Sequence, residues 1–314
     1  MAVTCLNEAH GESWAAYNGD CCDVVRQLPD NSVGFSVYSP PFRNLFVYSN
    51  SAADMGNSST NVEFEDHYRF LVHEKLRVTK PGRLTAVHCS DLPLTKWRDG
   101  HVGIEDFSGQ IIQAHKKAGW VYHGRRTIWK DPVVEMTRTK HVGLVYGQLI
   151  KDSSKSRGGM PDYLLTFIKP GDNDEPIRHE MDKATADRLG RKRMGLGNDE
   201  FSLAQWQEWA SPVWMTVDQT NVLNGHLARD GADERHICPL QLDVIHRALV
   251  LWSNPGDIVL SPFMGIGSEG YQAIKNRRRF VGVELKESYF NQATKFLREA
   301  EGMAHDLFSM AAAQ

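Results

Sequence analysis

The tetrapeptide Ser39-Pro40-Pro41-Phe42 places a hydroxyl group, two proline rings and an aromatic ring at one point of the chain. Prolines fix the backbone and lack an N–H group, so the carbonyl oxygens of Ser39 and Pro40 are free to accept hydrogen bonds from a ligand. The ring of Phe42 can cover that ligand by stacking. A rigid Pro-Pro turn at a strand end is the simplest alternative. The residue types therefore favour a binding site whose backbone contacts the ligand directly.

A second stretch whose residues could form a binding site is Ser261-Pro-Phe-Met-Gly-Ile-Gly267. It follows an apolar run and precedes a helical pattern. Its glycine turn lets a nucleoside cofactor approach the backbone, and Glu284, 17 positions after Gly267, is placed to receive ribose hydroxyls. A dinucleotide enzyme would also use the acid, but it seats a pyrophosphate near a third glycine. Here that glycine is Gly270, and the neighbouring Glu269 would repel an anion.

Both stretches match motifs of one family. Ser39 to Phe42 fit a Ser/Asp-Pro-Pro-aromatic motif, and Ser261 to Ser268 resemble Asp-Pro-Phe-x-Gly-x-Gly-Thr, with Ser261 where an acid is usual. The chain thus resembles the S-adenosylmethionine-dependent methyltransferases that modify exocyclic amino groups of DNA bases. The tetrapeptide precedes the cofactor motif, an order similar to the permuted group called beta. The resemblance covers residues 18–169 and 236–300.

The resemblance implies a mechanism and a set of site residues. Ser39 Oγ and the Pro40 carbonyl would accept the hydrogens of the amine, Pro41 would hold the turn, and Phe42 would stack on a base extruded from duplex DNA. Serine in the first position resembles cytosine-N4 enzymes more than adenine-N6 enzymes, which remain the alternative. The implied contacts to S-adenosylmethionine are Asp20, Cys21, Ser261, Pro262, Phe263, Gly265, Gly267, Ser268 and Glu284.

Contacts to double-stranded DNA must come from local patches, because the formal net charge is −3. Residues 125–157 carry eight basic and three acidic side chains. A solvated charged face is the alternative for any one of them. The candidates for phosphate contacts are Arg125, Arg126, Arg138, Lys140, Lys155, Arg157, Arg191, Lys192 and Arg193.

The elements that must position these residues alternate between strand and helix patterns. We expect strands at 31–38, 83–89, 120–129, 162–169, 257–263 and 280–284, and helices at 64–78, 107–118, 239–252, 268–276 and 287–301. Residues 43–62 are expected to form a long loop. The pattern is typical of an α/β fold with a mainly parallel sheet and helices on both faces. The resemblance implies a Rossmann-like methyltransferase sheet.

The α/β pattern breaks between residues 171 and 235. This segment is expected to be a small, mostly helical insertion with its own core around Trp206, Trp209 and Trp214, at the place where the family keeps its target-recognition region. The expected division is therefore a catalytic half at 1–170, the insertion at 171–235 and a cofactor-binding half at 236–314.

Composition narrows the cellular setting. The chain has 314 residues, 41% hydrophobic, and its five cysteines show no Cys-x-x-Cys spacing, which argues against a disulfide framework and a structural zinc site. No metal site is expected. No apolar run reaches membrane-spanning length and the first residues lack a signal pattern, so we expect a cytoplasmic protein of a bacterial or phage-infected cell, with no membrane contact.

Two other classes of function stay open at this point. One is an enzyme of the same fold that acts on RNA or protein, which the motif order disfavours. The other is a catalytically silent DNA-binding or antirestriction protein, for which Ser261 is the hint. The resemblance also suggests a homodimer and leaves open a cognate restriction endonuclease.

Overall fold

The computed structural model describes residues 3–41, 61–139, 144–179, 203–224 and 239–312. The strands are β1 (Asn7–His10), β2 (Trp14–Asn18), β3 (Val33–Tyr38), β4 (Thr79–Ser90), β5 (Leu92–Leu94), β6 (Gly103–Glu105), β7 (Val121–Ile128), β8 (Asp162–Ile168), β9 (Val213–Trp214), β10 (Ile258–Ser261) and β11 (Arg279–Glu284). The helices are α1 (Cys21–Arg26), α2 (Asn61–Val78), α3 (Lys96–Asp99), α4 (Phe107–Lys117), α5 (Pro132–Thr139), α6 (Tyr146–Lys151), the 3₁₀ turn η3 (Ser153–Lys155), α8 (Leu203–Ala210), α9 (Leu242–Trp252), α10 (Ser268–Lys275) and α11 (Glu287–Ala312).

One nine-stranded sheet organises the molecule, in the order β1-β2-β11-β10-β3-β4-β8-β7-β9. The strands β2, β11, β10, β3 and β4 run parallel, so their carboxyl ends share one edge. The strand β8 runs antiparallel to both β4 and β7. Its first residue, Asp162, therefore lies at the edge where the five parallel strands end.

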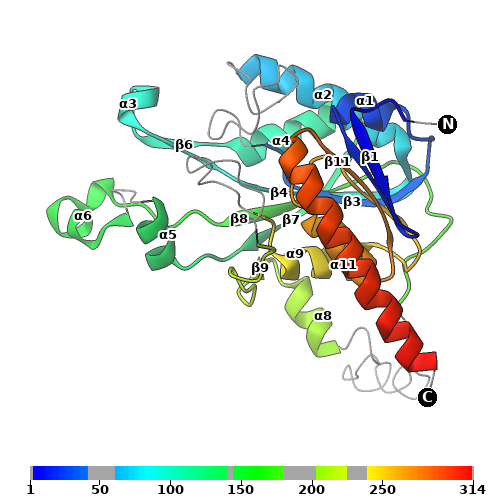
Figure 1. The fold of residues 1–314 in the computed structure, drawn as a ribbon. Coiled ribbons are helices and arrows are strands. Elements are labelled where there is room, and N and C mark those ends of the chain that lie inside the picture. Colours follow the sequence, from blue (N-terminus) through cyan, green and yellow to red (C-terminus); the bar gives the residue numbers. More distant parts are fainter. Residues whose placement is uncertain (1–2, 42–60, 140–143, 180–202, 225–238, 313–314) are drawn as a thin grey trace.

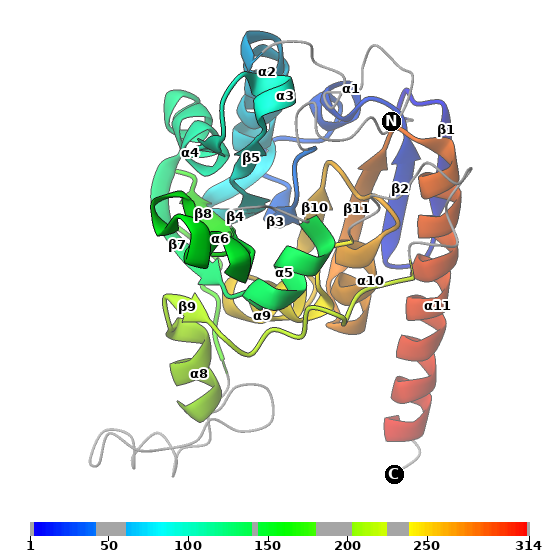
Figure 2. The same ribbon diagram turned by 90° about the vertical axis from the view of Figure 1, so that its left-hand side faces the viewer.

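Helices cover both faces of this sheet (Figures 1 and 2). The helices α1, α2 and α4 pack on one face around buried residues such as Tyr68, Leu71 and Ile111. The helices α9, α10 and α11 pack on the other face around residues such as Ile245 and Leu297. The expected α/β sheet with helices on both faces is confirmed.

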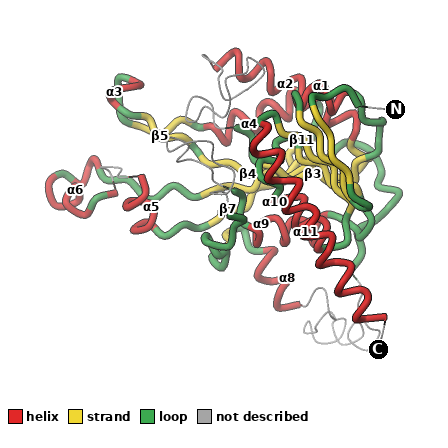
Figure 3. Tube along the Cα trace, viewed as in Figure 1, coloured by secondary structure: helices red, strands yellow, loops and turns green. Residues whose placement is uncertain are grey.

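Two arms project away from the sheet on the same side, as the tube drawing of Figure 3 shows. One is the β5–β6 hairpin with α3, and the other carries α5, α6 and η3 between β7 and β8. The arms expose large apolar side chains, among them Trp97, Val133, Tyr146 and Ile150. The sequence pattern predicted neither arm.

Most expected elements are present, with three corrections. The strand expected at 83–89 begins earlier, because β4 continues through Pro81 and Gly82, where Gly82 has a positive φ. The sheet is less parallel than expected, since β8 reverses direction. The loop expected at 43–62 ends in helix α2, and its residues 43–60 lie outside the described chain.

The separate core expected for the inserted segment is wrong where the structure describes it. Trp214 is buried in the main core, and its strand β9 extends the main sheet beside β7. Trp209 is buried against Val250 of α9, while Trp206 is exposed. The apolar side chains of this segment are therefore used to attach it to the sheet and α9.

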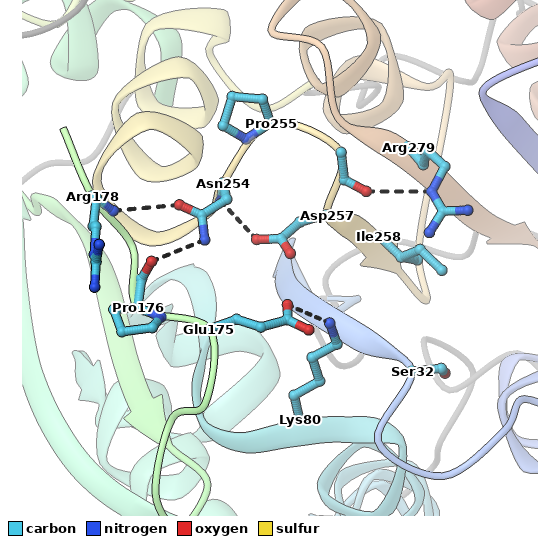
Figure 4. A pocket seen from close by; sticks show the side chains of 11 residues that line it. Ser32, Lys80, Glu175, Pro176, Arg178, Asn254, Pro255, Asp257, Ile258 and Arg279 are labelled. Carbon is cyan, nitrogen blue, oxygen red and sulfur yellow. Dashed lines mark hydrogen bonds and ion pairs between the residues drawn. The ribbon is translucent and has the colours of Figure 1, made fainter. Parts of the chain in front are cut away.

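A cavity of about 530 Å³ lies at the opposite edge of the sheet, where β4, β10 and β11 begin (Figure 4). The segment after β8 is tied there to the turn before β10, because Lys80 contacts Glu175 at 2.6 Å and Asn254 Nδ2 donates to the Pro176 carbonyl at 3.2 Å. No strand end that carries a site motif borders this cavity. The residues that line it hold the segment after β8 against the turn before β10.

Beside this cavity, β4 and the start of β10 are joined by an ion pair between Arg83 and Asp257, both buried. Arg83 also donates to the Gly34 carbonyl of β3 at 3.0 Å and to the Glu175 carbonyl at 2.8 Å. Asp257 accepts a further bond from the Asn254 N–H at 2.6 Å. The buried charges are therefore well supplied with partners, which is the condition for a buried ion pair to be tolerated.

A buried ionisable group lies at the first turn of α10. Burial raises the pKa of the Glu269 carboxyl, and the nearby charge of Glu284 raises it further, to about 8. Glu269 therefore holds a proton in the folded chain at neutral pH, so the repulsion of an anion that the sequence led us to expect from its charge does not apply.

No helix in the described ranges is both long and apolar enough to cross a membrane.

The first prediction concerns the buried ion pair. Asp257→Asn should lower the free energy of unfolding by about 3 kcal/mol or more, because it leaves the Arg83 guanidinium buried without its anion. Urea denaturation at neutral pH measures this loss. Glu175→Gln is the control, since it removes the exposed partner of Lys80 but keeps the backbone carbonyl that Arg83 uses. A loss in Asp257→Asn no larger than in this control would contradict the assigned role.

The second prediction concerns Glu269. Between about pH 5 and pH 8 the folded carboxyl keeps its proton while the unfolded one has lost it, so the stability of the wild-type chain should fall as pH rises through this range. Glu269→Gln cannot lose a proton, and its advantage over wild type should grow by about 2 to 4 kcal/mol across the same range. Denaturation curves at several pH values measure it, with the exposed Glu299→Gln as control. Parallel curves for wild type and Glu269→Gln would refute the shift.

Candidate active site

The two sequence motifs end neighbouring strands at the carboxyl edge of the sheet. Ser39 follows β3, and Ser261 is the last residue of β10, which pairs with β3 in parallel. The two motifs also touch, because the rings of Tyr38 and Phe263 lie with centroids 5.8 Å apart. Pro40 is buried and Pro41 half-buried beside Ser39. The sheet thus brings together two motifs that the sequence separates by more than 200 residues.

Ser39 takes part in a row of polar side chains that spans four neighbouring strands, β3, β4, β8 and β7. Its Oγ lies 2.9 Å from His88 Nδ1 on β4. His88 Nε2 lies 3.2 Å from Asp162 Oδ2 at the start of β8, by an oblique approach that departs from an ideal hydrogen-bond direction. Asp162 forms an ion pair with Lys130, two residues after β7.

The alternation of side chains along strands explains why these groups meet. Leu84 and Ala86 of β4 pack in the core under α9, so His88 points to the same face. Leu164 packs there too, and Asp162 shares its parity on β8, opposite Ser90. These polar side chains therefore lie on one face of the sheet, at the edge where the two motifs lie.

Burial would raise the pKa of the Asp162 carboxyl, but the charges and hydrogen bonds of His88 and Lys130 outweigh burial and lower it to about 2. Asp162 is 4% exposed. It is therefore an ionised carboxylate at any pH at which the protein would work, and it can only accept hydrogen bonds.

The opposite face of β3 is supported by a buried polar group. Lys75 Nζ donates to Thr85 Oγ1 at 2.7 Å and lies 3.8 Å from the centre of the Tyr38 ring. Burial lowers the pKa of the Lys75 amine well below its usual value. The hydroxyl groups of Tyr38 and Tyr68 are 2.9 Å apart. These contacts fix the strand residue that directly precedes Ser39.

The cofactor turn has the open backbone that the sequence predicts. Gly265 and Gly267 have positive φ values of 54° and 92°, and a Cβ atom on Gly265 would meet no described atom within 4 Å. The hydroxyls of Ser261 and Ser268 are buried and have no hydrogen-bond partner among the described residues. The turn thus combines space, backbone and unused hydroxyls, which fits a nucleoside cofactor beside it.

Glu284 ends β11 at the same edge and shapes this turn. Its Oε2 accepts a hydrogen bond from the Gly265 N–H at 2.9 Å, and its Oε1 accepts one from the Lys286 N–H at 2.8 Å. Pro262 and Phe263 lie between this carboxylate and Ser39 in the strand order.

Asp20 and Cys21 lie after β2, the strand beside β11. The Asp20 carboxylate caps α1 by accepting from the Cys22 N–H at 2.7 Å and the Asp23 N–H at 3.3 Å. Cys21 is buried, and its pKa is raised well above the usual value by the hydrogen bond to Cys22 and by burial. Cys21 is therefore a neutral thiol.

Those basic residues expected to contact DNA whose side chains the structure describes do not form one cluster. Arg125 is exposed and stacks on the Tyr163 ring, whereas Arg126 points to the other face and stacks on Trp252. Lys155 is exposed on the α5–α6 arm. Arg157 forms an ion pair with the buried Glu135 at 3.4 Å.

Several expected site residues lie outside the described part of the chain, namely Phe42, Lys140, Arg191, Lys192 and Arg193, and the side chain of Arg138 is not described. The sequence motifs did not predict a role for His88, Lys130 or Asp162. A histidine inside the apolar strand 83–89 was a signal for a buried polar group, but its partner could be found only by knowing that β8 runs antiparallel.

The family of the chain is shown by comparison with known sequences. Residues 33–295 match the N6/N4 methyltransferase family, described as DNA methylase. The type II methyltransferase M1.MboII of Moraxella bovis is 41% identical over 290 residues, covering 90% of this chain and 95% of that protein. The type II methyltransferase M.BglII of Bacillus subtilis is 24% identical over 287 residues, covering 90% and 68%.

Solved structures share the fold. A structure described as a DNA modification methylase of Thermus thermophilus, in complex with S-adenosyl-L-methionine, matches with a TM-score of 0.60 at 19% identity and covers 91% of this chain and 96% of that one. The cytosine-N4-specific PvuII DNA methyltransferase matches with a TM-score of 0.53 at 14% identity, covering 94% and 92%. The chain belongs to the N6/N4 DNA methylases, an S-adenosyl-L-methionine-dependent enzyme family.

Proposed function

We propose that this enzyme transfers the methyl group of S-adenosyl-L-methionine to the N4 amine of a cytosine flipped out of duplex DNA. This proposal rests on one observation. Ser39 and the open glycine turn follow neighbouring strands, and the Tyr38–Phe263 contact joins them. The serine at position 39 supports cytosine, and adenine N6 is the alternative base.

The chemistry asked of the protein is the activation of a poor nucleophile. An exocyclic amine shares its lone pair with the ring, so it attacks only when its hydrogens are held out of the ring plane. Ser39 Oγ and the Pro40 carbonyl would accept these hydrogens, and Phe42 would stack on the base. Bound S-adenosyl-L-methionine supplies an electrophilic methyl group. The turn at Gly265, with Ser261, Ser268 and Glu284, would hold it.

The DNA would be recognised by parts of the chain outside the sheet. Residues 171–235 are proposed as the target-recognition region, and Arg125 and Lys155 as phosphate contacts, because both side chains are exposed. A homodimer and a cognate restriction endonuclease remain proposals that the family resemblance suggests.

The test is incubation of the purified protein with labelled S-adenosyl-L-methionine and unmodified DNA, followed by nucleoside mass spectrometry. N4-methylcytosine supports the proposal, and N6-methyladenine would replace cytosine by adenine. Cofactor binding without methylated DNA would point to RNA or another substrate. Failure to bind the cofactor would favour a silent DNA-binding protein.

The third prediction concerns Ser39. Ser39→Ala should slow methyl transfer by about 100-fold, because it removes an acceptor that is aimed at the amine in the transition state. Binding of S-adenosyl-L-methionine, measured by calorimetry, should change less than twofold. A full transfer rate in this variant would refute the assigned mechanism. Ser32→Ala, directly before the start of β3, is the control.

The fourth prediction concerns DNA contacts. Arg125→Ala and Lys155→Ala should each weaken DNA binding and reduce the slope of log K against log salt by about 1, because each removes one phosphate contact. Arg157→Ala should leave the slope unchanged, since Arg157 is engaged with the buried Glu135. Binding isotherms at several salt concentrations measure the slopes, and equal slopes in all three variants would contradict the assignment.

A further inference from the structure

The hydroxyl of Ser39 is held by a histidine that neither sequence motif contains. His88 is 7% exposed and comes from the next strand, and it bridges Ser39 and Asp162 through its two ring nitrogens. A buried histidine in a core strand usually needs no further role. This one differs because one of its nitrogens faces the residue that would touch the reacting amine.

The ionised partner decides where the imidazole proton lies. Asp162 is a carboxylate, so it accepts and cannot donate. In the neutral, proton-accepting form of His88, the ring hydrogen therefore lies on Nε2, toward Asp162, and Nδ1 keeps a lone pair. Ser39 must then donate its hydroxyl hydrogen to His88 Nδ1 at 2.9 Å. The oxygen lone pairs of Ser39 are left for the substrate.

We propose that His88 is the positioning residue that makes Ser39 a hydrogen-bond acceptor and receives, through Ser39, the proton that the amine loses on methylation. This inference rests on the proposed function. It assigns roles to His88, Asp162 and Lys130 that neither the tetrapeptide nor the glycine turn supplies.

The nitrogen lone pair forms the new N–C bond, and the C–S bond breaks with its electron pair going to sulfur, which changes from sulfonium to thioether. The nitrogen then carries a positive charge and an extra proton. That proton passes to Ser39 Oγ while the Ser39 hydroxyl proton passes to His88 Nδ1. The imidazolium so formed lies beside the Asp162 carboxylate.

The surrounding charges fit this role. Lys130 pairs with Asp162 and keeps it ionised, so the carboxylate does not take the Nε2 proton from His88. On the same face, Arg126 of β7 is stacked on Trp252 and lies one strand further from His88 than Asp162 does. This face of the sheet presents the Asp162 carboxylate of β8 and the cations Lys130 and Arg126 from β7, together with hydroxyls that include those of Ser39 and Ser90.

The experiment compares wild type with His88→Asn in single-turnover methyl transfer across a range of pH. Asparagine can still accept the Ser39 hydrogen bond, but its amide is not a base. We expect a rate about 100-fold lower, which is typical of the loss of a general base. Dissociation constants for S-adenosyl-L-methionine and for DNA should stay within twofold. His123→Asn, an exposed position on β7, is the matched control and should behave as wild type.

The pH profile separates proton transfer from mere support. The wild-type rate should fall toward acid pH with a slope of one proton, because a protonated imidazole cannot accept from Ser39. In His88→Asn this acid limb should be absent. A rate within threefold of wild type, an unchanged acid limb, or a slow rate explained by weaker cofactor or DNA binding would each overturn the proposal.

A second variant leaves the histidine in place. Asp162→Asn offers an amide that can donate to Nε2, which would move the imidazole hydrogen to Nδ1 and reverse the bond to Ser39. The ¹⁵N shifts of His88 should show an unprotonated Nδ1 in wild type, and the rate of Asp162→Asn should be as low as that of His88→Asn. A protonated Nδ1 in wild type would overturn the proposal without any activity assay. A wild-type chain that methylates no base would refute the proposed function itself, and with it the proton transfer through Ser39 to His88.

Discussion

The buried Arg83–Asp257 pair is the contact on which the rest of the site depends. It joins β4, from the half of the chain that carries Ser39, to the turn before β10, from the half that carries the glycine turn. The ladder between β3 and β10 itself consists of the pairs Val259↔Phe35 and Leu260↔Ser36. A short ladder sets direction but resists sliding weakly. The charges at one edge of the sheet therefore help to fix the register that brings the two motifs together at the other edge.

The two faces of the sheet differ in the side chains that they place beside the site. On the face of α1, α2 and α4, Tyr38 is held by aromatic and amine contacts. On the face of α9, α10 and α11, Ser39 is held by His88, which leads to an ionised carboxylate. Successive residues of one strand thus have different tasks, because their side chains point to opposite faces. The contacts on the first face hold the strand in place before Ser39, and those on the second supply the polar partners of its hydroxyl.

The sequence predicts the sheet well because buried strands and amphipathic helices leave clear periods. The strands that end at Ser39, Ser261 and Glu284 follow from apolar runs, and their shared edge follows from parallel order. Strand direction in residues 120–169 does not follow, since a long connection between two strands permits either direction. Asp162 was therefore seen as a strand start and not as a group at the site edge. The separate core expected around Trp209 and Trp214 was wrong for a related reason. The residue type indicates that a tryptophan is buried, but it does not indicate which element it packs against.

The ion pair between Lys130 and Asp162 also has a consequence for how this enzyme can diversify. The two residues are the two ends of the α5–α6 arm, so the pair closes the base of a long excursion directly beside the site. Whatever lies between them can lengthen, shorten or change composition while both anchor points stay on the sheet. The polar chain behind Ser39 would keep its geometry through such changes. The arm is in this sense an exchangeable module, and natural variation or laboratory grafting can alter it separately from the chemistry.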